Sequence, residues 1–134
     1  MLPRTIFVTD DDVGMLRSIQ RLLKVHGFDV EPFESAEAFL DNASPSDAVC
    51  LVLDIDLSGM SGIALKRELA VSGISIPTIF ITGKDSEIVR KAALEVGCVA
   101  YLTKPFAAKQ LTDAIEKALA ASSEQASLVQ YYHS

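Results

Sequence analysis

The chain has 134 residues, a length that suits a single domain whose core is large enough to fold unaided. Hydrophobic residues make up 49% of it and charged residues 22%, which is the composition of a globular protein rather than a disordered one. The formal net charge of -6 argues against direct nucleic acid binding, because such surfaces are usually basic. No apolar stretch approaches the roughly 20 residues that span a bilayer, and the first residues, Met1 to Arg4, show no signal-peptide h-region. We therefore expect a cytoplasmic protein that makes no membrane contact.

Short apolar segments rich in β-forming residues alternate with segments in which apolar residues recur at helical spacing. The predicted strands, in chain order, are 5–9, 28–33, 49–53, 76–82 and 99–102. The apolar stripes of the predicted helices, in the same order, cover 13–23, 36–40, 63–71, 88–96 and 106–119. From Ser122 on, the composition turns to Ser, Gln and Tyr, so we expect one domain over 1–121 and a frayed tail over 122–134.

The alternation of strand and helix predicts an α/β fold, with a parallel sheet and helices on both of its faces. Right-handed crossovers leave few topologies, and we expect a flavodoxin-like, doubly wound (βα)5 sheet with strand order 2-1-3-4-5. The segment 49–53 is the most hydrophobic strand and should be central. Pro32 indicates that the end of the second strand does not lie in the middle of the sheet.

Polar residues follow the carboxyl ends of four predicted strands. They are Asp10 and Asp11, then Asp54 and Asp56, then Thr82, Gly83 and Lys84, and last Thr103, Lys104 and Pro105. Because the carboxyl ends of parallel strands meet at one edge of a sheet, where ligands bind, these residues should converge. Several carboxylates in one place repel strongly unless a cation lies among them. The sequence therefore predicts a divalent-metal site that handles phosphate.

This set of side chains suits phosphoryl transfer. Mg²⁺ prefers oxygen ligands and keeps several waters, so two or three carboxylates are enough to bind it. An aspartate beside the metal can act as a nucleophile and form an acyl phosphate. The charge of the phosphoryl oxygens would be neutralised by the metal, by Lys104 and by the hydroxyl of Thr82. Gly83 leaves room for the phosphate donor to approach.

The same segments resemble the receiver domain of two-component response regulators. The resemblance is carried, in the expected order, by 7–12, 51–62, 80–83 and 100–106, and it runs from about Thr5 to about Leu119. With Phe33-Glu34-Ser35-Ala36 leading to Phe39-Leu40, the pattern is most similar to receivers of nitrogen-fixation-type two-domain transcription regulators. Such regulators carry a helix-turn-helix domain after the receiver. We expect either a stand-alone receiver or a piece of a longer regulator.

The resemblance implies a separate role for each of the acidic residues. Asp54 would accept a phosphoryl group from a histidine kinase, with Mg²⁺ or Mn²⁺ as the cofactor. Asp11 and Asp54 would bind the metal through their side chains, Asp56 through its backbone carbonyl and Asp10 through water. The chain would be a signalling switch rather than an enzyme, since it would catalyse only its own phosphorylation and dephosphorylation.

The resemblance also implies how the signal leaves the site. Thr82 and Lys104 would bind the phosphoryl oxygens, and the peptide bond between Lys104 and Pro105 would be cis. Tyr101 would swing inward when Thr82 moves, remodelling the surface of the fourth helix, fifth strand and fifth helix. That surface would then bind an unidentified downstream protein or a second copy of the chain.

Four positions depart from the common receiver pattern. Ser58 stands where a proline is usual, Gly83 where alanine is, and Thr9 where an apolar residue is. Asp56 supplies a carboxylate where many relatives carry another side chain. We expect Ser58 to loosen its loop, and Asp56 and Lys84 to tune the lifetime of the phosphoryl group.

Two other functions fit parts of the pattern. Haloacid-dehalogenase-like phosphatases also have an apolar strand that ends in Asp-x-Asp, as at Asp54 and Asp56. They need an acidic pair after the lysine, however, whereas the pair here, Asp10 and Asp11, precedes the nucleophile. A pseudo-receiver would keep the fold as an interaction module without phosphorylation, and the complete set of site residues argues against it.

Overall fold

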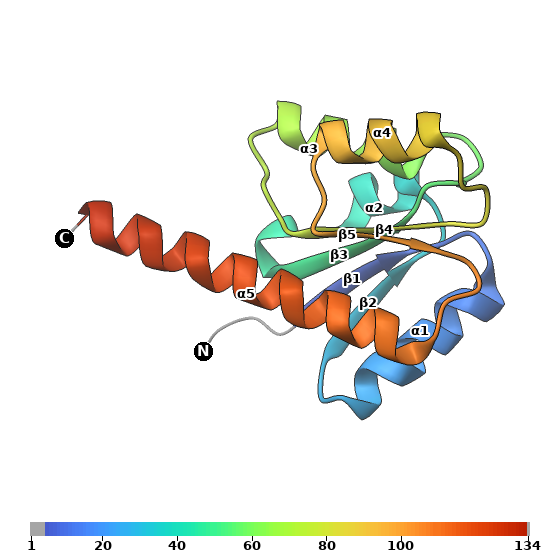
Figure 1. The fold of residues 1–134 in the computed structure, drawn as a ribbon, viewed down its shortest axis with the longest axis horizontal. Helices are drawn as coiled ribbons and strands as arrows, with labels where there is room; N and C mark the ends of the chain where they lie inside the picture. The colour runs from blue at the N-terminus through green and yellow to red at the C-terminus, as the bar shows by residue number, and fades with distance from the viewer. Residues whose placement is uncertain (1–4, 134) are drawn as a thin grey trace.

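Five parallel strands form one sheet in the order β2-β1-β3-β4-β5 (Figure 1). The computed structural model describes the backbone of residues 5–133 and the side chains of residues 5–121. The strands are β1 (Thr5–Thr9), β2 (Asp29–Phe33), β3 (Ala48–Asp54), β4 (Thr78–Thr82) and β5 (Ala100–Thr103). The predicted doubly wound fold and its strand order are confirmed, with β3 in the centre and β2, which contains Pro32, at an edge.

Helices cover both faces of this sheet. They are α1 (Val13–Val25), α2 (Ala36–Asn42), α3 (Gly62–Val71), α4 (Glu87–Val96) and α5 (Ala108–His133), with a short 3-10 helix, η1 (Pro45–Asp47), before β3. Helices α1 and α5 lie on one face, and α2, α3 and α4 lie on the other (Figure 1).

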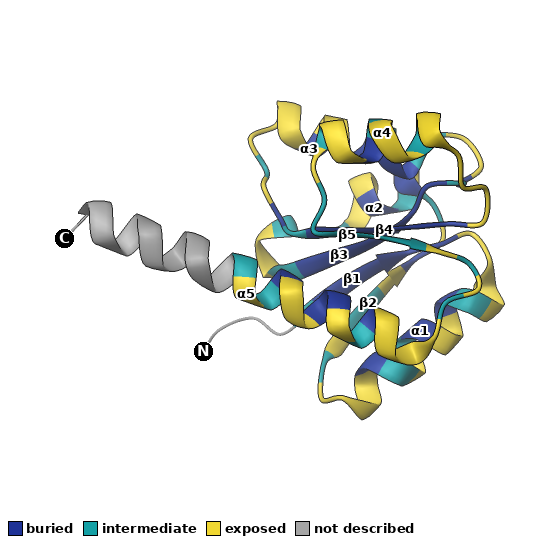
Figure 2. Ribbon diagram, in the orientation of Figure 1, coloured by how far each residue is buried: buried dark blue, intermediate teal, exposed yellow. Residues whose placement is uncertain are grey.

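The two faces of the sheet form two separate hydrophobic cores. Side chains alternate along β3, so that Leu51 and Leu53 belong to the core under α2, α3 and α4, whereas Cys50 and Val52 belong to the core under α1 and α5. All four are fully buried. Strands β1, β3 and β4 form a largely buried layer between helices whose outer surfaces are exposed, whereas the edge strands β2 and β5 are only partly buried (Figure 2). Burial on both faces explains why β3 is an uninterrupted apolar run rather than an alternating one.

Strand β4 begins later than the sequence predicted. The apolar run starts at Ile76, but the strand starts at Thr78. Pro77 has no N–H to give to the ladder, although its carbonyl oxygen accepts from the Leu51 N–H at 2.9 Å. The five residues of β4 are all buried.

Four helices begin with a side-chain cap. Asp12, Ser35, Ser61 and Ser86 precede α1, α2, α3 and α4, and each accepts a hydrogen bond from a backbone N–H three residues on. Such caps satisfy one of the free N–H groups at a helix start. The cap of α1 is the third acid of the run at 10–12, so the beginning of this helix fixes the position of the two acids before it.

Helix α5 continues through 122–133, where only the backbone is described. The predicted fraying of this tail, and the predicted domain limit at residue 121, stay predictions. Among the described residues, none of the helices combines the length and the apolar character that crossing a membrane requires.

The start of α3 lies directly against the end of β3. A Cβ atom on Gly62 would clash with the carbonyl oxygen of Asp54 and lie 3.0 Å from its carbonyl carbon. The Gly62 N–H also donates to the Ile55 carbonyl oxygen at 3.3 Å. Only glycine permits this approach, so the residue type at 62 fixes where the loop after Asp54 returns to the sheet.

We predict that Gly62→Ala lowers the free energy of unfolding by about 1–3 kcal/mol, because α3 or the backbone of Asp54 must move to admit the methyl group. Urea denaturation followed by circular dichroism measures the change. Gly83→Ala is the matched control: its nearest new neighbour, a side-chain carbon of Lys104, lies 4.0 Å away, and we expect a change within about 0.5 kcal/mol. Equal midpoints for Gly62→Ala and the wild type would contradict the prediction.

Candidate functional site

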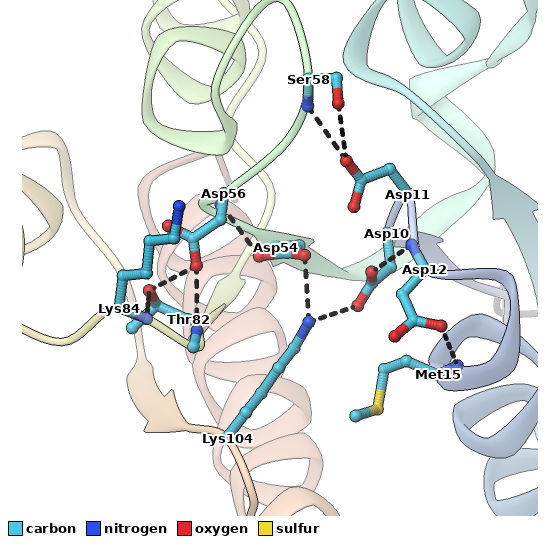
Figure 3. Close-up of polar contacts among 11 residues, drawn as sticks. Asp10, Asp11, Asp12, Met15, Asp54, Asp56, Ser58, Thr82, Lys84 and Lys104 are labelled. Carbon is cyan, nitrogen blue, oxygen red and sulfur yellow. Dashed lines mark hydrogen bonds and ion pairs between the residues drawn. The ribbon is translucent and has the colours of Figure 1, made fainter.

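The polar residues predicted to converge do so at the carboxyl edge of the sheet (Figure 3). Asp10 directly follows β1, Asp54 ends β3, Thr82 ends β4, and Lys104 directly follows β5. Hydrogen bonds join side chains that are up to 94 positions apart in the sequence. The edge therefore brings together one residue or more from each of four strand ends.

Lys104 lies between two buried carboxylates. Its Nζ donates to Asp10 Oδ2 at 3.0 Å and to Asp54 Oδ2 at 3.1 Å. The side chains of Asp10 and Asp54 are only 1% and 3% exposed, whereas that of Lys104 is 20% exposed. One ammonium group thus faces two carboxylates in a place that water barely reaches.

This arrangement shifts the pKa values of its members. Burial raises the pKa of Asp10 to about 6, and the negative charge of Asp54 adds to the rise. The backbone N–H of Asp12, which donates to Asp10 Oδ1 at 2.9 Å, works in the opposite direction, as does Lys104. Burial alone would lower the pKa of Lys104, but hydrogen bonds and charges from Asp10 and Asp54 raise it above its usual value. Lys104 is therefore a firmly charged group.

Three carboxylates form a set that suits a divalent cation. Asp10, Asp11 and Asp54 each offer an oxygen, and these atoms lie within 4.8 Å of one another. Asp10 and Asp54 are buried and Asp11 is exposed, so the set opens to solvent on one side. One lysine cannot balance three negative charges, and carboxylate oxygens are the donors that Mg²⁺ prefers. The residues present therefore fit a magnesium site.

The loop between β3 and α3 is tied down from two sides. The N–H and the hydroxyl of Ser58 both donate to Asp11 Oδ2, each at 3.1 Å. On the other side, the Met60 N–H donates to Glu37 Oε1 at 2.9 Å, and this contact lowers the pKa of Glu37. We expected Ser58 to loosen this loop. It ties the loop to Asp11 instead, because serine offers an N–H and a hydroxyl where proline has neither.

Asp56 uses its side chain as well as its backbone. Its N–H donates to Asp54 Oδ1 at 2.9 Å. Its Oδ2 accepts from the Thr82 hydroxyl at 2.8 Å and from the Gly83 N–H at 2.9 Å. The resemblance implied only a backbone role for Asp56 at a metal, so sequence reasoning missed this contact. An acid two residues after the central strand was the only signal, and it does not reveal where a loop side chain points.

Tyr101 is held at the surface of α4. Its hydroxyl donates to Asp85 Oδ1 at 2.8 Å, and the Arg90 guanidinium lies 5.3 Å from its ring centroid. Arg90 also pairs with Asp85 at 2.9 Å. Burial, followed by the hydrogen bond and charge of Asp85, raises the pKa of Tyr101 to about 12. Asp85 and Arg90 were not among the predicted site residues, because nothing in the sequence pairs them with a strand aromatic.

The structure also describes two further features named from the sequence, the Lys104–Pro105 peptide bond and the side chain of Thr9. The peptide bond between Lys104 and Pro105 is cis. Thr9, which stands where receivers usually have an apolar residue, is buried, and its hydroxyl finds no hydrogen-bond partner among the described residues.

The comparison with protein families decides what kind of domain this is. The model of the response regulator receiver domain matches residues 6–116. The chain belongs to the response regulator receiver family. Receiver domains bind Mg²⁺ at an acidic aspartate cluster, and in this chain Asp10, Asp11 and Asp54 lie close together.

Individual relatives of this receiver agree with the family match. It is 41% identical over 110 residues to Nodulation protein W of Bradyrhizobium diazoefficiens, covering 82% of the chain and 48% of that protein. It is 36% identical over 118 residues to the transcriptional regulatory protein FixJ of Rhizobium meliloti, covering 88% of the chain and 58% of that protein. The solved structure of the response regulator StyR matches with a TM-score of 0.87 and 37% identity, over 99% of this chain and 67% of that chain.

The predicted similarity to receivers of nitrogen-fixation-type regulators is confirmed by the relation to FixJ. The receiver spans about half the length of the curated relatives it matches.

We predict that Lys104→Met lowers the free energy of unfolding at pH 7 by about 3 kcal/mol, because two buried carboxylates lose the one ammonium group that pairs with them among the described residues. Urea denaturation measures this loss. Added Mg²⁺ should stabilise Lys104→Met more than the wild type, since a bound cation replaces the missing charge.

The control for this variant is Lys109→Met. Lys109 pairs with Asp113 at 3.1 Å, but both side chains are largely exposed, so its loss should cost less than about 0.5 kcal/mol. The same urea midpoint for both variants would contradict the importance of the Lys104 ion pairs.

Proposed function

We propose that this receiver is a phosphorylation-dependent signalling switch in which Asp54 accepts a phosphoryl group from a histidine kinase. The observation that carries the proposal is the position of Asp54 at the sheet edge. Its carboxylate is almost fully buried, 3.1 Å from the ammonium of Lys104, and within 4.8 Å of the oxygens of Asp10 and Asp11. A carboxylate placed among a cation and metal ligands is a nucleophile whose product can be stabilised.

The transfer itself is a displacement at phosphorus. An Asp54 oxygen forms the new P–O bond, the P–N bond of the phosphohistidine breaks, and its electron pair stays on the imidazole nitrogen. Lys104 balances negative charge on the phosphoryl oxygens, since its Nζ already lies 3.1 Å from Asp54 Oδ2. Hydrolysis of the acyl phosphate by water later restores Asp54. The receiver would act on no other substrate.

The metal would be held by Asp11 and Asp54 through their side chains, by Asp56 through its backbone carbonyl and by Asp10 through water. When bound, Mg²⁺ or Mn²⁺ supplies positive charge for the phosphoryl oxygens. Asp10, whose side chain is 1% exposed, would keep its carboxylate beside Lys104 with either metal bound.

The signal would pass from Thr82 to Tyr101. The Thr82 hydroxyl would turn to a phosphoryl oxygen, and Tyr101 would move into the space that this leaves. That movement requires Tyr101 to release Asp85 on the α4 side, where the hydroxyl now donates at 2.8 Å. The surface of α4, β5 and α5 would change as a result, and with it the binding of a downstream protein or of a second copy of the chain.

We predict that acetyl phosphate with Mg²⁺ adds about 80 Da to the wild type on Asp54, the mass of one phosphoryl group on a carboxylate nucleophile. Intact-mass and peptide mass spectrometry measure it. Asp54→Asn should gain no mass, and Asp47→Asn, which changes an exposed acid in η1, should gain as much as the wild type. Turnover of the donor without a stable adduct would favour a phosphatase, and no reaction at all would favour a pseudo-receiver.

We also predict that phosphorylation promotes homodimers through the α4, β5 and α5 surface. Sedimentation velocity should detect a larger species when acetyl phosphate and Mg²⁺ are present. Asp54→Asn should stay at its starting size under the same conditions. An unchanged sedimentation coefficient for fully phosphorylated wild type would contradict dimerisation while leaving the phosphorylation proposal intact.

A further inference from the structure

Two hydrogen-bond donors at the end of β4 converge on one carboxylate oxygen. Oδ2 of Asp56 accepts from the Thr82 hydroxyl at 2.8 Å (Figure 3) and from the Gly83 N–H at 2.9 Å. Two fixed donors aimed at one anionic oxygen are the arrangement by which proteins bind oxyanions. The end of β4 is thus an anion-binding position, and a side chain of the chain itself fills it.

Both donors are fully used in this contact. Thr82 gives its single hydroxyl proton to Asp56 Oδ2, because a carboxylate oxygen can only accept, and the Lys84 N–H donates to Thr82 Oγ1 at 3.0 Å. Thr82 is 0% exposed, which leaves its hydroxyl no water to exchange with. In this state the hydroxyl has no second proton to offer to any other acceptor.

Asp56 is also anchored to the proposed nucleophile. Its N–H donates to Asp54 Oδ1 at 2.9 Å, and β3 and β4 are neighbours in the sheet, with Asp54 opposite Ile81. A phosphoryl group attached to Asp54 would therefore carry its oxygens into the neighbourhood of the same two donors. Two anions cannot share them without strong repulsion.

We infer that the Asp56 carboxylate is an internal competitor of the phosphoryl group, which occupies the anion-binding position of Thr82 and Gly83 and so holds the unmodified state. The inference rests on the proposed phosphorylation of Asp54. Asp56 is a positioning residue: it fixes the direction of the Thr82 hydroxyl. Thr82 turns to a phosphoryl oxygen only when Asp56 Oδ2 has left.

The first test needs no phosphoryl group. Amide hydrogen exchange by NMR on the unmodified protein should be at least about tenfold faster at Gly83 in Asp56→Ala than in the wild type, because the N–H loses its acceptor. Asp56→Asn keeps the shape of the side chain and one acceptor oxygen but loses the charge. The exchange rate at Gly83 in this variant should lie between the rates in the wild type and in Asp56→Ala. Equal exchange at Gly83 in all three proteins would overturn the contact on which the inference stands.

The second test measures the competition itself. Calorimetric titration with beryllofluoride and Mg²⁺, a mimic of the phosphoryl group, should show about tenfold tighter binding to Asp56→Ala and to Asp56→Asn than to the wild type. Asp47→Asn is the control, because it removes the same charge from the opposite edge of the sheet, where η1 leads into β3, and its affinity should be that of the wild type.

The possible results distinguish a failure of this inference from a failure of the proposed phosphorylation of Asp54. Wild-type protein that binds beryllofluoride, with both Asp56 variants equal to it or weaker, overturns the inference alone. Wild-type protein that neither binds beryllofluoride nor gains mass from acetyl phosphate overturns the proposed function and the inference with it. A gain in affinity for Asp47→Asn as large as that for Asp56→Asn would assign the effect to net charge and overturn the role of Asp56.

Discussion

The rest of the site depends on an imbalance of buried charge. Asp10 and Asp54 are withdrawn from water at the end of two adjacent strands, and within the described part of the chain Lys104 alone offsets them, at 3.0 and 3.1 Å. A buried carboxylate without full compensation is costly in a folded protein. A cation bound there would lower this cost, so the same charges that weaken the fold favour a metal.

Two other polar side chains at the edge, Asp11 and Thr82, have partners within the chain. Asp11 accepts twice from Ser58, and Thr82 donates to Asp56. Each of these contacts must be exchanged for another if the group is to reach a metal or a phosphoryl oxygen. The unmodified state is therefore a specific hydrogen-bonded arrangement, and its stability sets how much free energy a phosphoryl group must supply to displace it.

The sequence predicted the strands from their hydrophobic period and the convergence of acids from the direction of parallel strands. It predicted the strand order because right-handed crossovers leave few topologies, of which the flavodoxin-like one was chosen. It placed Asp10, Asp11, Asp54 and Lys104 together because the carboxyl ends of parallel strands meet at one edge of a sheet. It did not predict the Ser58 and Asp56 contacts. Both residues lie in the loop after β3, where side-chain direction depends on a turn closed by Glu37 and by the backbone approach at Gly62, and no periodic pattern encodes such a turn.

The separation of the sheet's two cores has a mechanical consequence. Tyr101 packs against the core beneath α2, α3 and α4, whereas Met15 and Phe106 pack against the core beneath α1 and α5. A shift of α4 would repack the first core directly and would reach the second only through the sheet that separates them. The α1 side of the domain could thus keep its shape for one binding partner while the α4 side changes its shape for another.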